Sequence, residues 1–203
     1  LALSHGARQI EAVELDPEMV ALVRDTFGDF AGGVYEDPRV TVHIREARGF
    51  VAQAERQYDL VHIGLLDSFG ASGAGVQSLN ESYIYTVEAL TRYIECTTPG
   101  GIVSITRWLK LPPRDSLKLI ATAIAALREL GVSDPGRRLA VIRGWNTSTL
   151  LIKNGELSSI DVAAIREFTA SRSFDVSWLP GITAAETNRY NVLDAAYLYS
   201  GTA

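Results

Sequence analysis

The chain is poor in the residues that cross-link or anchor a protein. It has one cysteine, Cys96, so an internal disulfide and a metal site built from several cysteines are both excluded. Cys96 falls in a helical pattern, which indicates a small buried apolar residue. No apolar run approaches the roughly 20 residues needed to span a bilayer. The longest candidate is the Ala-rich stretch Leu119–Leu127.

A basic excess is also missing. The chain carries 19 Lys and Arg against 24 Asp and Glu, for a net charge of −5 and a pI of about 5.2. The basic residues are scattered, so no positive field favours nucleic acid or anionic lipid as a partner. With 203 residues, of which 47% are hydrophobic, the chain is long enough for one domain with a proper core.

Histidine is scarce and dispersed. The three histidines, His5, His43 and His62, lie far apart in the sequence. His43 and His62 alternate with apolar residues inside strand-like runs, which favours half-buried strand positions over metal ligands. We therefore expect no metal site.

The two ends do not read as the ends of a domain. The chain begins with Leu1 rather than Met, inside what looks like the tail of a helix, and its last residues, Gly201–Ala203, form no closing element. We expect it to be a piece of a longer protein.

Strand-like and helix-like segments alternate along the chain. This alternation predicts an α/β fold: a mostly parallel sheet with helices on both faces. The expected strands are Gln9–Leu15, Val40–Ile44, Tyr58–Ile63, Ile102–Thr106, Leu139–Ile142, Thr149–Lys153 and Phe174–Leu179. The expected helices are Glu18–Phe27, Ala47–Ala54, Asn80–Thr97, Asp115–Leu130 and Ser158–Arg172.

Local signals set several boundaries. Asp16-Pro17 is a helix start, with Asp as the N-cap and Pro in the first turn. Thr98–Gly101 (TPGG) predicts a turn. The strands at 139–142 and 149–153 lack a crossover helix, so we expect an antiparallel hairpin at one edge of the sheet. We interpret residues 1–153 as the main domain and 154–203 as a C-terminal extension packed on it.

Acidic residues follow the first two expected strands. Glu14 and Asp16 stand at the tip of the first strand, where a carboxylate offers paired acceptors to ribose hydroxyls. Asp16 is accounted for as a helix N-cap, whereas Glu14 stands outside that role and is favoured as a ligand residue. Glu46 follows the second strand and either accepts from an exocyclic amine or caps a helix.

The stretch Tyr58–Ser78 (YDLVHIGLLDSFGASGAGVQS) places an acid after a strand and before a loop of Gly, Ala and Ser. Ligands bind at the carboxyl ends of strands in open α/β sheets, so a site role is favoured for Asp67. The loop lacks the Lys-Ser/Thr ending of a phosphate-binding P-loop. We interpret it as a lid, with an ordinary crossover loop as the alternative.

These pieces in this order resemble the class I S-adenosylmethionine-dependent methyltransferase fold, and within it the spermidine synthase-like branch. The matching segments are VELDP (Val13–Pro17), EARGF (Glu46–Phe50), YDLVHIGLLDSFG (Tyr58–Gly70), LNESYIYTVEAL (Leu79–Leu90) and TPGGIVSIT (Thr98–Thr106). The resemblance covers most of the chain from Gln9 to about Lys153 and implies a Rossmann-like sheet.

The resemblance also implies roles for single residues. Glu14 matches the acid that holds the nucleoside ribose, and Glu46 with Ala47 matches the pair that contacts the adenine. Residues implied to line the site of S-adenosylmethionine or its decarboxylated form are Glu14, Asp16, Glu46, Ala47 and Gly64, and the implied catalytic residue is Asp67.

One departure concerns the chemistry. Aminopropyltransferases of this branch end the corresponding strand in an Asp-x-x-Asp pattern, whose first acid helps to deprotonate the attacking amine and whose second binds the polyamine. In this sequence those positions are Gly64 and Asp67. A missing general base typically costs a factor of about 10² to 10⁴, so ordinary spermidine synthesis is not expected of this chain.

A second departure concerns the first strand of the fold. The glycine-rich loop that cradles the methionine part of the cofactor is expected upstream of Leu1. We therefore expect this fragment, truncated at its N-terminus, to bind S-adenosylmethionine poorly or not at all. Loss of the first strand would leave an open sheet edge, which favours a homodimer.

The run LPGITAAETNRYNVL (Leu179–Leu193) resembles the tail of bacterial spermidine synthase-like proteins that join this domain to membrane-spanning segments. The parent protein is therefore expected to carry such segments, with this domain in the cytoplasm.

Three functions remain open. The first is a transferase that moves a group from the sulfonium cofactor to a small-molecule amine or other acceptor. The second, based on Gly64, is a non-catalytic nucleoside- or polyamine-binding or regulatory domain of a larger membrane protein. The third is a nicotinamide-dependent dehydrogenase, since an acid after the second strand also serves NAD; the EARGF and TPGG segments favour the methyltransferase-like order.

Overall fold

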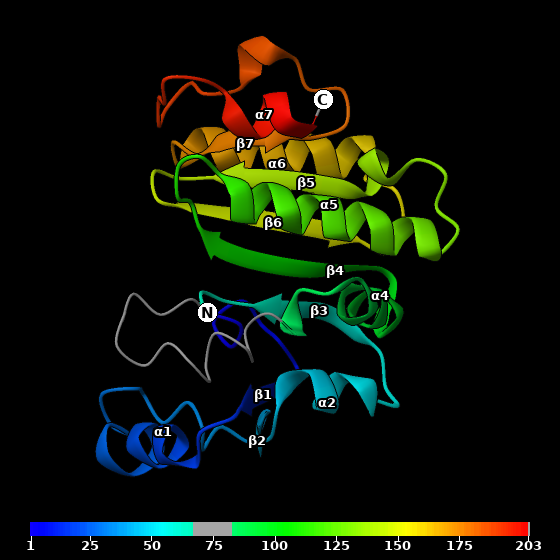
Figure 1. Ribbon diagram of the computed structural model, residues 1–203. Coiled ribbons are helices and arrows are strands. Elements are labelled where there is room, and N and C mark those ends of the chain that lie inside the picture. Colours follow the sequence, from blue (N-terminus) through cyan, green and yellow to red (C-terminus); the bar gives the residue numbers. More distant parts are fainter. Residues whose placement is uncertain (67–82, 203) are drawn as a thin grey trace. The chain divides into compact units, whose positions relative to one another are not determined.

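The computed structural model describes residues 1–66 and 83–202. The chain divides into two compact units, Leu1–Ala54 (unit 1) and Glu55–Ala203 (unit 2). Figure 1 labels the helices and strands of both units. The predicted boundary between residues 153 and 154 is a different one, and it stays a prediction.

Unit 1 is built on two parallel strands. β1 (Ile10–Glu14) pairs with β2 (Val40–Ile44), and their last residues, Glu14 and Ile44, are partners in register. Each strand is followed by a short helix, α1 (Pro17–Ala21) and α2 (Ala47–Ala52). Asp16 caps α1 and Pro17 occupies its first turn, as the sequence predicts.

The helix expected over Glu18–Phe27 is not uniform. α1 gives way to a π-helical segment, Leu22–Thr26, whose wider turn is closed by a bond from the Phe27 N–H to the carbonyl oxygen of Leu22. A Cβ at Gly28 would lie 2.5 Å from the carbonyl oxygen of Arg24. Only glycine therefore fits where this segment ends.

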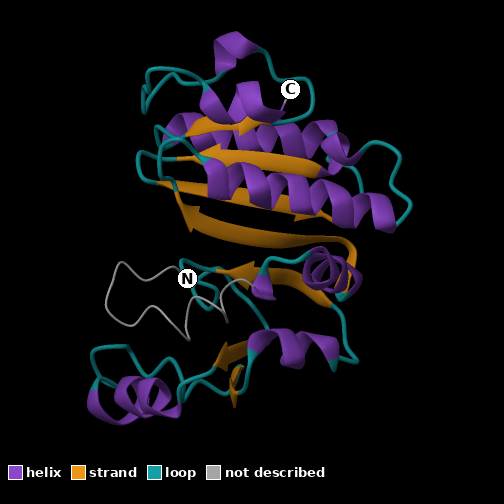
Figure 2. Ribbon diagram, in the orientation of Figure 1, coloured by secondary structure: helices purple, strands orange, loops and turns teal. Residues whose placement is uncertain are grey.

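Unit 2 contains a mixed five-stranded sheet in the order β3-β4-β6-β5-β7, and Figure 2 shows these strands flanked by helices. The strands are β3 (Tyr58–Ile63), β4 (Thr97–Trp108), β5 (Leu139–Arg143), β6 (Thr147–Lys153) and β7 (Asp175–Trp178). β3 and β4 are parallel, and the remaining pairs are antiparallel. The fold is thus the predicted α/β class. The prediction that the sheet is mostly parallel is wrong for this sheet as described, because three of its four strand pairs are antiparallel. The predicted hairpin, β5–β6, does not form the edge, because β7 pairs with β5 outside it.

Helices α4 (Val87–Glu95), α5 (Arg114–Glu129), α6 (Ser159–Ser171) and α7 (Tyr197–Thr202) accompany this sheet. Two 3₁₀ turns, Pro135–Arg138 and Ala184–Glu186, lie in the connections. None of the helices within residues 1–66 and 83–202 combines the length and the apolar character that crossing a membrane requires.

The main core lies on one face of this sheet. Val103 and Ile105 of β4 are buried there together with their register partners on β6, Ile152 and Leu150. Helices α4 and α5 supply further side chains that are almost fully buried: Leu90, Tyr93, Ile94, Leu119, Ala123 and Leu127. Burying one large apolar side chain contributes about 1.5–3 kcal/mol, so this face holds most of the unit's hydrophobic stabilisation.

A smaller core lies on the opposite face. Ala140, Val176 and Leu179 are buried there, and partly buried residues of α6, Val162 and Ile165, pack against them. Ser158 and Asp161 form a capping box that starts α6, at the serine that the sequence predicts as its cap.

Two boundaries between Asn80 and Gly101 differ from expectation. α4 starts at Val87, capped by Thr86, and not at Asn80; residues 80–82 lie outside the described residues. The predicted turn at Thr98–Gly101 is a bulge within β4, because Tyr58 pairs with Thr97 while Leu60 pairs with Ile102. Asn154 holds the bulge through backbone bonds to Gly100 and Gly101.

A buried ion pair joins β5 to β7, and hydrogen bonds from the C-terminal segment to both of its members hold that segment in place. Arg143 at the end of β5 and Asp175 at the start of β7 are 4% and 1% exposed, with 3.4 Å between Nη2 and Oδ2. Asp175 also accepts from the backbone N–H groups of Arg189, Tyr190 and Asn191, at 2.5, 3.0 and 2.7 Å. The Arg143 guanidinium in turn donates to the carbonyl of Asn191 and to Oδ1 of Asn188.

Candidate functional site

Glu14 is the last residue of β1, and its carboxylate lies against the backbone of the two residues that follow the strand. Oε1 accepts from the N–H groups of Leu15 and Asp16, at 2.8 and 3.1 Å. The residue is half-buried. The two amides fix one oxygen, and because a carboxylate has about four acceptor sites, others remain for a ligand hydroxyl.

Asp16 acts as a helix cap. Its Oδ1 accepts from the N–H of Glu18 at 2.8 Å, which satisfies one of the donors at the start of α1. This structural role accounts for the aspartate. Its further role at a donor site stays a prediction.

Glu46 is the N-cap of α2. Oε1 accepts from Arg48 N–H at 2.8 Å and Oε2 from Gly49 N–H at 2.6 Å. A Cβ at Gly49 would come within 3.2 Å of Oε2, so glycine helps the carboxylate approach the backbone. Ala47 is the first residue of α2 and is half-buried. The structural alternative for Glu46 is therefore realised, and an added contact to adenine stays a prediction.

The strand pairing brings these residues to one edge of unit 1. β1 and β2 are parallel and in register at Glu14 and Ile44, and the Arg45 N–H donates to the carbonyl oxygen of Glu14 at 2.9 Å. Glu14, Asp16, Glu46 and Ala47 consequently follow the carboxyl ends of two neighbouring strands. Ligands of open α/β sheets bind at such an edge.

Replacing Glu46 with alanine is expected to destabilise the start of α2 by about 1 kcal/mol, because two backbone N–H groups lose their acceptor. Hydrogen exchange at the amides of Arg48 and Gly49 measures the effect. The control is Glu36→Ala, an exposed loop residue of the same unit, for which we expect a change below about 0.5 kcal/mol. Unchanged exchange in Glu46→Ala would show that the cap contributes nothing.

Gly64 follows β3 in unit 2 and is half-buried. Among residues 1–66 and 83–202, a Cβ built on it meets no atom closer than Nε2 of His62, at 3.9 Å. This part of the chain thus leaves room for a side chain at position 64. Asp67, the predicted catalytic residue, lies outside the described residues.

His62 differs from expectation. It is exposed rather than half-buried, and it lines a cavity of about 520 Å³ in unit 2. Ser104, its register partner on β4, and Thr106 lie on the same wall. Thr106 Oγ1 and Thr149 Oγ1 form a hydrogen bond of 2.9 Å. Strand periodicity predicts neither the exposure of His62 nor the cavity, since both depend on which helices cover the sheet. The sequence does indicate that His62 and Gly64, two residues apart, lie on the same face of the sheet.

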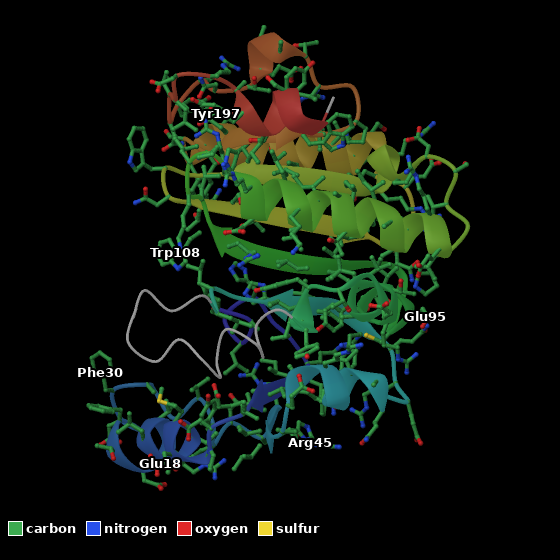
Figure 3. The ribbon with its side chains drawn as sticks, viewed as in Figure 1. Glu18, Phe30, Arg45, Glu95, Trp108 and Tyr197 are labelled. Atoms are coloured by element: carbon green, nitrogen blue, oxygen red, sulfur yellow. The ribbon has the colours of Figure 1, made fainter. Side chains whose placement is uncertain are left out.

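Trp108 ends β4, and Figure 3 shows its ring projecting from that end of the strand. The preceding residue, Arg107, places its guanidinium carbon 4.5 Å from the centre of the Tyr85 ring. Stacking of this kind contributes about 0.5–1 kcal/mol at exposed sites. Aromatic and cationic groups therefore lie at the carboxyl end of β4, a grouping that no local sequence pattern predicts.

The chain is similar in sequence and in fold to several known proteins. A polyamine aminopropyltransferase from Nitrosomonas europaea is 26% identical over 128 residues, which cover 63% of this chain and 36% of that protein. The spermidine synthase of Thermotoga maritima superimposes with a TM-score of 0.54 at 16% identity, over 82% of this chain and 53% of that one. A spermidine synthase solved with the transition-state analogue AdoDATO superimposes with a TM-score of 0.52 at 15% identity. The superposition covers 82% of this chain and 52% of that one.

The chain spans about half the length of these solved proteins and 36% of the curated relative. The family described as the spermine/spermidine synthase domain matches residues 3–109, more than half of the 203 residues. The structural neighbours have the same Rossmann-like fold. The chain therefore belongs to the spermine/spermidine synthase domain family.

Proposed function

We propose that this chain is a transferase domain that binds S-adenosylmethionine or its decarboxylated form and passes a group to a small-molecule acceptor. The observation that carries the proposal is the meeting of Glu14 and Glu46 at the carboxyl ends of β1 and β2. An edge with a half-buried carboxylate is suited to a nucleoside. The relatives named as aminopropyltransferases and the neighbour bound to AdoDATO support the same ligand class.

In this proposal three residues of unit 1, Glu14, Glu46 and Ala47, contact the nucleoside. Glu14 accepts from the ribose hydroxyls with the oxygen sites that the backbone amides of Leu15 and Asp16 leave open. Glu46 and Ala47 border the adenine. When bound, the sulfonium donor supplies a carbon that is open to nucleophilic attack. The protein's contribution is to orient the nucleoside and to accept the acceptor's proton.

Whether the site can use a polyamine as its acceptor depends on the negative charge that the site offers. Polyamines are cations, and a carboxylate beside them both neutralises the charge and takes a proton. Gly64 provides neither function. A non-catalytic domain that binds nucleoside or polyamine is therefore the second candidate, and Gly64 is the observation that favours it.

Glu14→Ala is expected to raise the Kd for S-adenosylhomocysteine about tenfold, because a hydrogen bond to a charged group contributes about 1.5–3 kcal/mol. NMR titration of the labelled chain measures it, and the wild-type Kd is expected to be weaker than micromolar. Asp37→Ala is the matched control, since Asp37 pairs with Arg39 at 2.7 Å and precedes the start of β2, not the carboxyl end of a strand. Equal Kd values for the wild type and Glu14→Ala would contradict the ribose role.

Transfer itself distinguishes the two candidates. The chain is incubated with radiolabelled S-adenosylmethionine, or with its decarboxylated form, and putrescine. Labelled product that depends on the acceptor supports the transferase. Saturable nucleoside binding without product supports the binding domain.

A further inference from the structure

Another cavity of unit 2 lies beside the C-terminal half of α5. It has a volume of about 280 Å³, and its lining residues come from α5, from the 3₁₀ turn at Pro135 and the two residues before it, from β5 and from β7. All of them belong to unit 2. Small-molecule sites occupy roughly 300–1,000 Å³, so this cavity suits a ligand at the small end of that range.

The inner surface of this cavity is apolar. Ile120 and Leu139 are buried, and Ile124, one turn after Ile120 on α5, is half-buried. The indole of Trp178 forms another wall, and its Nε1 donates to the carbonyl oxygen of Gly136 at 3.1 Å. A Cβ at Gly136 would come within 3.1 Å of Cζ2 of this ring. Glycine therefore lets the indole lie directly against the backbone, which fixes the ring in place.

Two opposite charges flank the apolar surface. Arg128 lies in the last turn of α5, and Asp134 stands at the N-cap position of the 3₁₀ turn, where its side chain makes no capping bond. Both side chains are exposed. Within residues 1–66 and 83–202, neither of them has an ion-pair partner. Both charges are therefore available to a ligand in the cavity.

We propose that this cavity binds a free α-amino acid with an apolar side chain. The ligand's carboxylate pairs with the Arg128 guanidinium, which can donate two parallel hydrogen bonds to it. The ligand's ammonium group pairs with the Asp134 carboxylate, and its side chain packs against Ile124 and Trp178. A fatty acid or an alkylamine would satisfy one of the two charges, whereas a zwitterion satisfies both. The assignment concerns binding alone and does not depend on the proposed transferase function.

The first test is an NMR titration of the nitrogen-labelled 203-residue chain with L-leucine. The chain has three tryptophans, Trp108, Trp145 and Trp178, and the indole signal missing from Trp178→Phe identifies Trp178. L-Leucine is expected to shift the Trp178 signal saturably and to leave the other two in place. Isocaproate, which lacks the ammonium group, and isoamylamine, which lacks the carboxylate, are each expected to bind about threefold more weakly, because exposed ion pairs contribute little. Absence of a saturable shift with L-leucine overturns the proposal.

The second test matches each charge of the protein to one charge of the ligand. Arg128→Gln is expected to raise the Kd for L-leucine about threefold and to leave the Kd for isoamylamine unchanged. Asp134→Asn is expected to raise the Kd for L-leucine by the same factor and to leave the Kd for isocaproate unchanged. The control is Glu129→Gln, an exposed neighbour on α5, for which we expect no change with any ligand.

The pattern across the three ligands decides the result. If Arg128→Gln weakens L-leucine and isoamylamine equally, Arg128 does not contact the carboxylate and the proposal is wrong. The same holds for Asp134→Asn if it weakens L-leucine and isocaproate equally. An equal effect of Glu129→Gln would show that only the general surface charge matters, which also overturns the proposal.

Discussion

Asp175→Ala is expected to lower the free energy of unfolding by about 3–5 kcal/mol, because it leaves the Arg143 guanidinium buried without its anion. Both side chains are almost completely shielded from water. Alanine also removes the acceptor of three consecutive backbone N–H groups, those of Arg189, Tyr190 and Asn191. The C-terminal segment would then lose its attachment to β7.

The ionisation of this pair supports the expectation. Burial by itself raises the pKa of Asp175, but hydrogen bonds from the backbone of Tyr190, Asn191 and Arg189 outweigh it, so the pKa lies below its ordinary value. Burial lowers the pKa of Arg143, and the charge of Asp175 partly offsets the shift. A carboxyl group with a lowered pKa stabilises the fold above its unfolded value, near 3.9, and this stability is lost as the pH falls toward the folded value.

Urea unfolding followed by circular dichroism measures the loss. Asp134→Ala is the control, an exposed aspartate of the same unit, with an expected change below about 0.5 kcal/mol. The double variant Arg143→Met/Asp175→Ala is expected to be more stable than Asp175→Ala, since it removes the uncompensated charge. If Asp175→Ala unfolds at the wild-type urea concentration, the ion pair does not stabilise the segment.

Gly64→Asp is expected to raise kcat/KM for putrescine about 10²-fold, because a carboxylate beside a cationic acceptor attracts the charge and assists proton removal. The described part of the chain accommodates the change, since the one atom of it that a Cβ at position 64 meets is Nε2 of His62, at an ordinary contact distance of 3.9 Å. The backbone at Gly64 is not in the left-handed region, so an aspartate introduces no backbone strain.

Gly64→Asn is the matched control. Its side chain has nearly the shape of aspartate without the charge, and we expect no gain with putrescine. Initial rates at several putrescine concentrations separate KM from kcat. Equal rates for the two variants would show that charge at position 64 does not set the acceptor.

Much of the local structure could be predicted from alternation and capping. Val40–Ile44 and Tyr58–Ile63 have the predicted bounds, because alternating or apolar runs bounded by turn residues leave few other conformations. Ser158 caps its helix as expected. The bulge at Gly100 and the edge position of β7 depend on partners distant in the chain, Asn154 and β5, which local patterns do not contain.

In the candidate site, too, some features follow from local sequence patterns and others depend on distant parts of the chain. The edge position of Glu14 and Glu46 follows from parallel pairing, which the β-α-β alternation predicts. The sequence leaves two roles for Glu46, a ligand contact and a helix cap. The two hydrogen bonds that make it a helix cap are visible only in the structure. The exposure of His62 depends on how far helices cover the sheet, and no strand pattern encodes that.

The strand order of unit 2 also constrains how the chain acquires its structure during synthesis. β6 lies between β4 and β5, and β7 pairs with the outer side of β5. When the ribosome has released β5, its partner on either side is still missing, since β6 and β7 follow later in the chain. A nascent chain at this stage exposes the unpaired edges of β4 and β5, which are open to association with other chains. The short β5–β6 connection, residues 144–146, limits the exposure of the edges that β6 covers to the time needed to add β6, whereas the outer edge of β5 stays unpaired until β7 follows.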